Sequence, residues 1–180
     1  MVAGRVGDRL GRRRGLMMSS VIGTLAGVIM TIAQPSSSWE LLVLGRLISG
    51  VSSGLYTVLV PIYVSEIAPV HMRGGIGAVN GVAANVGVFI PQVLGLSELL
   101  GNERGWSWIL VIITVPCILQ LITLAWSPES PRYLGITRDN SEEARQALMK
   151  LRNNDVDTVE TELREMKEVD TRQYYTAVIP

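Results

Sequence analysis

Four long apolar runs, separated by short polar stretches, dominate the first 126 residues of the chain. They cover about 16–33, 41–63, 76–95 and 106–126, each near the ~20 residues that an apolar helix needs to cross a bilayer. The runs are too long for strands and do not alternate between apolar and polar positions, and open sheet edges cannot face lipid. The pattern therefore predicts an all-α integral membrane protein with four transmembrane helices, joined by the turns QPSSSWE, VSEIAPVHMRGG and LSELLGNERG.

The composition changes after residue 126. A turn-rich connector, SPESPRYLGIT, is followed by Asn140 and Glu143 at the spacing of a capping box. Two short amphipathic helices are expected after it, with apolar stripes at Ala144, Ala147, Leu148 and Leu151, and at Val156, Val159, Leu163, Met166 and Val169. The chain thus divides into a transmembrane bundle segment, 1–126, and a cytoplasmic linker with intracellular helices, 127–180.

Small residues recur four apart within the apolar runs. The pairs are Gly23 with Gly27, Gly50 with Gly54, and Gly77 with Gly81. Such pairs let helices approach closely in lipid, so they predict a tightly packed bundle rather than separate anchors.

Charge is balanced overall but unevenly distributed. The formal net charge is zero, which argues against an electrostatic nucleic-acid binder, yet residues 1–15 carry five arginines and one aspartate. Because lysine and arginine favour cytoplasmic loops, both chain ends and the turn at 64–75 are expected in the cytosol. The turns at 34–40 and 96–105 then lie outside, and the four tryptophans fall at helix ends, where an aromatic belt belongs: Trp39, Trp106, Trp108 and Trp126.

The sequence contains few residues of the types that catalyse reactions or bind metal ions. Cys117 is the one cysteine and lies in an apolar run, and His71 is the one histidine and lies in a turn. We find no nucleophile–base arrangement, metal-ligand cluster or phosphate-cradling loop, so neither an enzyme nor a cofactor nor a metal site is expected.

The charged turns on the cytoplasmic side are more informative. The first stretch, GRVGDRLGRRRG, contains Asp8, Arg9, Arg12 and Arg13; glycines shape a tight turn there, and the aspartate can face a helix N-terminus. Arginines can make forked bonds to carboxylates, and two further turns each supply one acid and one base, Glu66 with Arg73 and Glu129 with Arg132. Charges confined to one side of an apolar bundle can form a network that is made in one conformation and broken in another. The alternative is that they serve turn structure and topology alone.

These motifs resemble those of a known family. The sequences GRVGDRLGRRRG, LGRLISG, PIYVSEIAPVHMRGG, QVLGL and SPESPRYL follow the order and spacing of the sugar porter branch of the major facilitator superfamily, most closely animal facilitative hexose transporters, over nearly all of residues 4–170. The resemblance implies a protein of twelve helices in two halves, of which this chain holds the end of helix 2 through helix 6 and part of the intracellular linker. It implies that the partner is the absent C-terminal half, that the chain alone does not transport, and that the eight charged residues named above form a cytoplasmic salt-bridge network.

The resemblance also points to residues that line the sugar site. A glutamine that commonly hydrogen-bonds the sugar on helix 5 is matched here by Gly81, which has no side chain to do so. Asn80 or Asn85 is expected to compensate; otherwise the sugar preference is altered. The remaining substrate-lining candidates are Ala84, Val88 and Gln92.

The leading hypothesis is therefore part of a uniport hexose transporter of the plasma membrane. The runs at 76–95 and 106–126 contain no acidic residue, and intramembrane carboxylates often mark proton relays, which favours facilitated transport. A proton-coupled sugar carrier, a polyol or inositol carrier, and a truncated regulatory isoform that does not transport remain alternatives.

Overall fold

The computed structural model describes residues 2–69, 72–102, 105–137, 140–152, 155–156, 158–164 and 166. Its element order is α1 (Val2–Leu10), α2 (Arg12–Ala33), α3 (Trp39–Ile67), α4 (Arg73–Leu94), α5 (Trp106–Trp126), a short π-helical segment η2 (Tyr133–Thr137) and α6 (Ser141–Leu151). A further helical segment follows within 156–166. Every regular element in these residues is helical, so the all-α prediction is confirmed.

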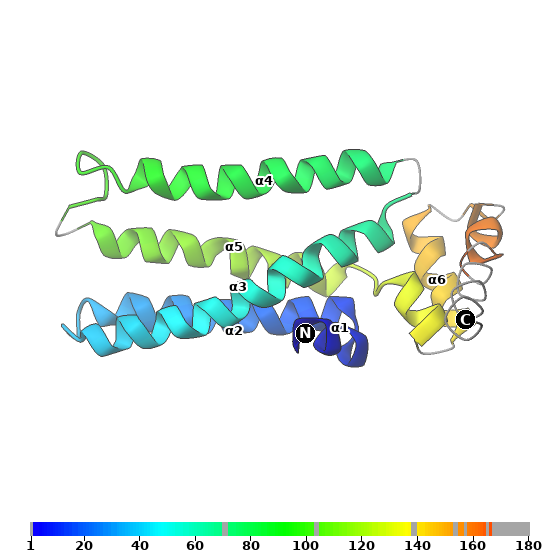
Figure 1. Ribbon diagram of the computed structural model, residues 1–180, viewed down its shortest axis with the longest axis horizontal. Coiled ribbons are helices and arrows are strands. Elements are labelled where there is room, and N and C mark those ends of the chain that lie inside the picture. Colours follow the sequence, from blue (N-terminus) through cyan, green and yellow to red (C-terminus); the bar gives the residue numbers. More distant parts are fainter. Residues whose placement is uncertain are drawn as a thin grey trace, which may run out of the picture.

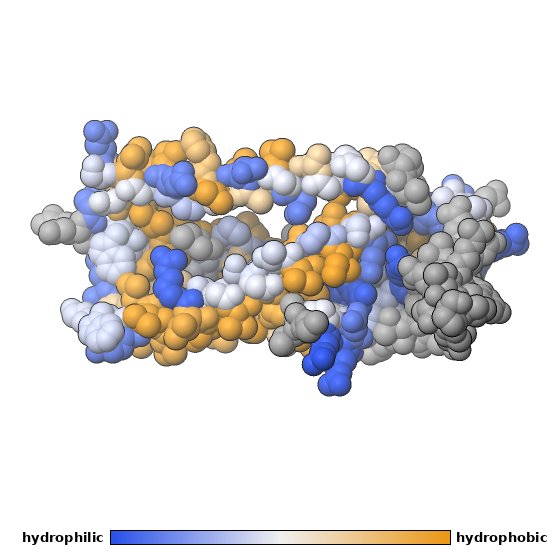
Figure 2. All heavy atoms as spheres, in the orientation of Figure 1, coloured by the Kyte–Doolittle hydropathy of each residue, from blue (hydrophilic) through white to orange (hydrophobic). Residues whose placement is uncertain are grey.

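Helices α2, α3, α4 and α5 are each long and apolar enough to cross a membrane. They run roughly side by side along the length of the molecule, with η2 and α6 together at one end (Figure 1). Apolar side chains cover their flanks and polar ones gather toward the ends, as Figure 2 shows. Three of the four tryptophans are largely exposed near helix ends, at Trp39, Trp108 and Trp126.

Three of these helices extend beyond the apolar runs that predicted them. Helix α3 continues to Ile67, so that it includes Glu66, and α2 and α4 begin at Arg12 and Arg73. Residues Val2–Leu10 are helical too, where a tight turn was expected, and the turn is confined to Gly11. Charged residues with long side chains have good helix propensity and reach water from a helix end, so hydropathy alone makes the predicted helices too short.

Helix α2 is the centre of the packing. It contacts α3 most extensively and α5 next, whereas α4 touches α3 and α5 only sparingly and buries no residue. The core between α2, α3 and α5 consists of Leu16, Leu55, Leu59, Tyr63 and Leu124. A second, smaller core joins η2 to α6 through Tyr133, Leu134, Ala144 and Ala147, with Leu163 packed against it.

The amphipathic helices after residue 126 follow their predicted pattern in part. The Asn140 side chain accepts a hydrogen bond from the Glu143 backbone N–H at 3.2 Å and caps α6 as predicted. Ala144, Ala147, Leu148 and Val159 are buried, but Val156, which was placed on the same apolar stripe as Val159, is 42 % exposed. Val169 and His71 lie outside the described residues.

Only one of the three glycine pairs is packed closely in the described part of the chain. A Cβ at Gly23 would meet Ser52 Oγ and Cys117 Sγ, and one at Gly27 would overlap the Thr114 side chain. A Cβ at Gly50, Gly54, Gly77 or Gly81 would meet no atom within 4 Å. The prediction of close approach is therefore confirmed for α2, whereas the pairs on α3 and α4 meet no neighbour among the described residues, because the spacing of small residues does not specify which face a neighbour covers.

The Gly27 contact yields a stability prediction. Gly27→Ala should destabilise the bundle by about 1–3 kcal/mol, because the methyl group overpacks the contact between α2 and α5. The matched control is Gly54→Ala, where alanine enters open space in α3 and should be neutral or gain up to ~1 kcal/mol of helix propensity. Unfolding in detergent micelles, followed by circular dichroism, measures both; equal transitions for the two variants would contradict the close packing.

Candidate functional site

Two polar regions stand out in a molecule that is otherwise apolar along its length. One is a charged cluster at the end of the bundle, formed by Asp8, Arg12, Arg13, Glu66 and Glu129 with Ser130 and Tyr133. The other is a cavity in the middle of the bundle.

Gly11 makes the charged cluster possible. It lies between α1 and α2 with a φ of 96°, in the left-handed region that favours glycine. A Cβ at this position would lie 2.6 Å from Glu129 Oε2, so the missing side chain lets the carboxylate reach the N-terminus of α2. There Glu129 Oε1 accepts hydrogen bonds from the backbone N–H of Arg13 at 2.8 Å and of Ser130 at 3.1 Å. A carboxylate at this place satisfies orphan N–H groups and favours the positive end of the helix dipole.

The sequence had suggested an aspartate for this role. Asp8 instead lies on α1, 65 % exposed, and pairs with Arg12 Nη1 at 3.0 Å. The N-terminus of α2 receives Glu129 from the connector after α5, which is 116 residues further along the chain.

The Arg13 side chain, in turn, connects the N-terminus of α2 to the C-terminus of α5. Its Nε donates to the Leu124 carbonyl and its Nη2 to the Ala125 carbonyl, both at 2.7 Å. Cationic side chains that bond the last carbonyls of a helix stabilise its negative end. Arg13 therefore receives a cap on its own helix and provides one for α5.

Arg12 is the other centre of the cluster. Its Nε lies 3.2 Å from Glu66 Oε2 on α3, although the N–H is not aligned for a hydrogen bond, so the contact is an ion pair. Its guanidinium lies 5.3 Å from the centroid of the Tyr133 ring, within the range of a cation–π contact. The Arg12 and Glu66 side chains are 14 % and 9 % exposed. Glu66 also accepts a hydrogen bond from Ser130 Oγ at 2.6 Å, so one carboxylate connects α2, α3 and the connector.

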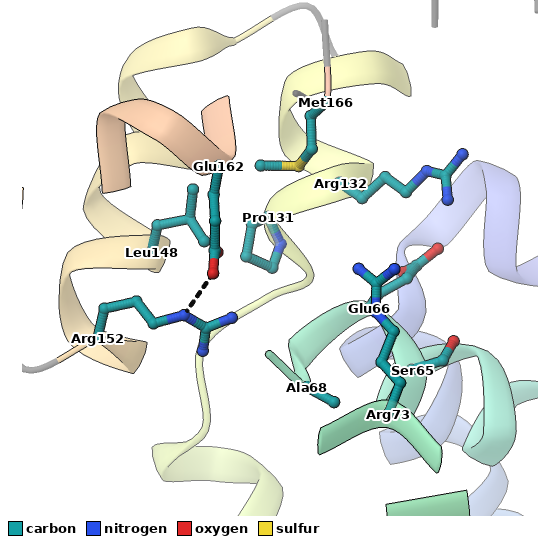
Figure 3. A pocket seen from close by; sticks show the side chains of 10 residues that line it. All are labelled: Ser65, Glu66, Ala68, Arg73, Pro131, Arg132, Leu148, Arg152, Glu162 and Met166. Carbon is teal, nitrogen blue, oxygen red and sulfur yellow. Dashed lines mark hydrogen bonds and ion pairs between the residues drawn. The ribbon is translucent and has the colours of Figure 1, made fainter. Parts of the chain in front are cut away.

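The remaining predicted members of the network lie apart from these contacts. The Arg9 backbone carbonyl accepts a bond from the Tyr133 hydroxyl at 3.2 Å, and its side chain has no ion pair among the described residues. Arg73 and Arg132 line a second cavity of about 200 Å³ beside Glu66, together with Arg152, the C-cap residue of α6 (Figure 3). Arg152 pairs with Glu162 at 2.9 Å and donates to the Ile67 carbonyl at 3.3 Å, tying α6 to the end of α3.

The cavity in the bundle has a volume of about 570 Å³ and lies between α2, α3, α4 and α5. Its lining residues fall near the middle of each helix: Gly23, Gly27, Met30, Ser49, Ser52, Ser53, Tyr56, Thr57, Val60, Pro61, Asn80, Ala84, Thr114 and Cys117. The α3 contribution repeats every three to four residues, as one helix face does. The lining is rich in hydroxyl groups and contains one carboxamide and no charged side chain.

Of the substrate-lining residues predicted from the sequence, the structure brings Ala84 to this cavity, together with Asn80, one of the two asparagines expected to compensate for Gly81. Asn85 is exposed, and its Nδ2 donates to the Gly81 carbonyl of its own helix at 3.0 Å. Gly81, Val88 and Gln92 are exposed as well and are not among the lining residues. The hydroxyl groups on this face of α3 were not among the predicted residues, although the four-residue spacing of Ser49, Ser53 and Thr57 indicates that they share one helix face.

The fold and these two regions define a helical membrane protein with a cavity in the middle of its bundle, lined by hydroxyl groups and apolar surface, and a charged cluster at one end. The family model described as "Sugar (and other) transporter" matches residues 1–176, and the chain belongs to that family. This confirms the resemblance to sugar porters.

Relatives and solved structures agree with this assignment. Facilitated glucose transporter member 4 of solute carrier family 2 from Mus musculus is 42 % identical over 165 residues, and member 1 from Gallus gallus is 42 % identical over 166 residues. These alignments cover 91 % and 92 % of this chain but 32 % and 33 % of the relatives, so the chain spans about a third of their length. The fold matches the partially occluded inward-open xylose transporter XylE from E. coli with a TM-score of 0.74 and 24 % identity, covering 98 % of this chain and 46 % of XylE.

The Arg12 contacts predict the stability of the charged cluster. Arg12→Ala should cost about 2–3 kcal/mol, because it leaves the nearly buried Glu66 carboxylate without its cation. The control is Arg14→Ala on the same helix, an exposed arginine whose loss should change stability by less than ~0.5 kcal/mol. Chemical denaturation in micelles compares the two; similar losses would show that the ion pair does not hold α2 to α3.

Proposed function

We propose that this chain is part of a facilitative, uniport hexose transporter that moves glucose-like sugars across the plasma membrane by alternating access. The observation that carries the proposal is the uncharged, hydroxyl-lined cavity at mid-bundle depth. Its volume of about 570 Å³ lies within the ~300–1,000 Å³ range of small-molecule sites. A polyhydroxylated ligand is recognised by groups that exchange hydrogen bonds with its hydroxyls, and serine, threonine, tyrosine and asparagine supply such groups here.

The relatives support the substrate class. Two of the similar proteins are named as facilitated glucose transporters, and a solved XylE structure with a TM-score of 0.74 and 25 % identity is described as a proton:xylose symporter bound to 6-bromo-6-deoxy-D-glucose. Uniport is favoured over proton symport because the described cavity lining holds no carboxylate to carry a proton.

The rest of the transporter is proposed to come from helices outside this sequence. Alternating access in this class of protein needs two halves that rock about a midplane site. The chain spans about a third of its relatives, and α4 is left almost without neighbours. We place the arginine-rich end of the bundle in the cytosol, because positive charge favours that side.

The uptake experiment tests this proposal directly. Proteoliposomes that carry the full-length gene product should take up labelled glucose with saturation, and a protonophore should leave the rate unchanged. Proteoliposomes with the 180-residue chain alone should show no uptake above empty liposomes. Uptake that collapses with the proton gradient would establish symport instead. Competition by inositol but not by glucose would establish a polyol carrier, and absence of uptake by either protein would favour the regulatory isoform.

The charged cluster is proposed to act as a cytoplasmic gate. We assign to the gate the cluster's Asp8, Arg12, Arg13, Glu66 and Glu129, with Arg12 and Glu66 as the central ion pair, and the three neighbouring arginines predicted from the sequence, Arg9, Arg73 and Arg132. The pair keeps the charged groups of α2 and α3 in place at this end, where the network is proposed to hold this half against the absent half while the end is closed.

Neutralising Glu66 should therefore open this end more often. In the full-length protein, Glu66→Gln should raise several-fold the rate at which a membrane-impermeant maleimide, added from the cytosolic side, labels Thr57→Cys in a Cys117→Ser background. Thr57 lines the cavity, so its labelling reports access from that end. Arg14→Ala serves as the control and should leave labelling unchanged. An unaltered rate in Glu66→Gln would show that the ion pair is structural only.

A further inference from the structure

The turn between α4 and α5 exposes two leucine side chains. Leu96 and Leu99 are 55 % and 49 % exposed, and neither belongs to either core or lines either cavity. The turn lies at the end of the bundle opposite η2 and α6 (Figure 1). Both helices that it joins are long and apolar enough to cross a membrane, so the turn lies where the apolar layer of a bilayer meets water.

The order of residues gives this turn an apolar side and a polar side. Residues 96–99 form a four-residue turn, closed by a hydrogen bond of 2.9 Å from the Leu99 N–H to the Leu96 carbonyl. The leucines occupy its first and last positions, which the hydrogen bond holds side by side. Ser97 and Glu98 occupy the two central positions and are both exposed. The base of the turn is therefore apolar and its corner is polar.

Two glycines hold the turn in this shape. A Cβ at Gly101 would collide with the backbone of Gly95, so the chain leaves the turn directly against the point where it entered. The Leu100 N–H donates to the Leu94 carbonyl at 3.1 Å and closes the same base. The Gly101 N–H donates to the Leu96 carbonyl at 2.9 Å. Backbone groups that bond one another in this way need no water, which allows this part of the turn to face lipid.

Exposed tryptophans on neighbouring helices mark the level at which the turn lies. Trp108 is in the first turn of α5 and is 61 % exposed. Trp39 begins α3 at the same end of the bundle and is 72 % exposed (Figure 1). Tryptophan is enriched at membrane–water interfaces, where its amphipathic ring lies among the headgroups. Leucines exposed at this level meet lipid rather than bulk water.

We propose that residues 95–101 are a membrane anchor: Leu96 and Leu99 insert into the boundary between headgroups and acyl chains, in the leaflet opposite the charged cluster. Apolar faces of interfacial segments lie ~5–10 Å into this boundary. The partner is the lipid surface itself, and the polar corner of the turn stays in water. Helix α4 buries no residue against its neighbours, so the anchor fixes its depth in the bilayer where packing does so least. This inference does not depend on which molecule the protein transports.

The test places a nitroxide spin label at single positions of the turn in the full-length protein, with its other cysteines replaced, in phosphatidylcholine nanodiscs. Electron paramagnetic resonance measures how often the label collides with oxygen, which concentrates among acyl chains, and with a water-soluble nickel chelate. Leu96→Cys and Leu99→Cys should give an oxygen-to-nickel ratio several-fold higher than Glu98→Cys, the matched control at the corner of the same turn.

Two outcomes would overturn the anchor. A high nickel collision rate at all three positions would place the whole turn in water. Low rates for both reagents at positions 96 and 99 would show that the leucines pack against protein instead of lipid. Circular dichroism and size-exclusion profiles, equal to those of the unaltered protein, establish that each labelled variant retains the fold.

Gly101→Ala tests whether the contact between the two glycines holds the leucines in place. Its methyl group should open the base of the turn and lower the ratio at Leu99→Cys toward that at Glu98→Cys. The matched control is Gly87→Ala, where a Cβ enters open space on α4, and this variant should leave the ratio unchanged. Equal ratios in the two glycine variants would overturn the role assigned to Gly101 in the anchor.

Discussion

The close approach of α2 to α3 and α5 is the constraint on which the rest of this structure depends. In lipid the hydrophobic effect does not drive helices together, so association relies on tight van der Waals contact and on hydrogen bonds between helices. Gly23 and Gly27 provide the contact, since a methyl group at either position would collide with α3 or α5. Ser52 and Tyr56 provide the bonds, donating from α3 to the Ser19 carbonyl and the Ser20 hydroxyl.

The same approach fixes both polar regions. Once α2 lies against α3 and α5, its N-terminus comes beside the C-terminus of α5, where the free N–H groups of one helix and the free carbonyls of the other need partners. Glu129 accepts from an N–H group of α2, and Arg13 donates to a carbonyl of α5. Arg12, the preceding residue, pairs with Glu66 of α3. The charged cluster is thus attached to the helix ends themselves, so separation of α2 from α3 or α5 at this end breaks ion pairs and caps together.

The sequence predicts part of this arrangement, for physical reasons that can be named. Apolar runs near 20 residues predict four spanning helices, because a helix satisfies all its backbone hydrogen bonds internally in lipid. Asn140 predicts a helix cap, because the residues that form a cap are adjacent in sequence. Asp8, four positions from Arg12, is a local partner, but Glu66 lies 54 positions away, and only the packed fold selects it. For the same reason the sequence did not predict which glycine pair meets a neighbouring helix. Nor did it predict that Ala84 of α4 lines the cavity while the Asn85 side chain donates to a carbonyl of its own helix.

The hydrogen bonds that hold the bundle together also shape the chemistry of its cavity. A hydroxyl in a membrane helix gains by donating to a carbonyl or to another hydroxyl, because an unpaired donor is costly away from water. Each such bond removes a donor from the cavity and leaves an acceptor exposed there. A site lined by committed hydroxyls is therefore biased toward ligands that donate, and a ligand with many hydroxyl groups, which must also accept, needs a donor from elsewhere. In this structure the one carboxamide of the described lining, Asn80, lies on α4, the spanning helix with the sparsest contacts to its neighbours.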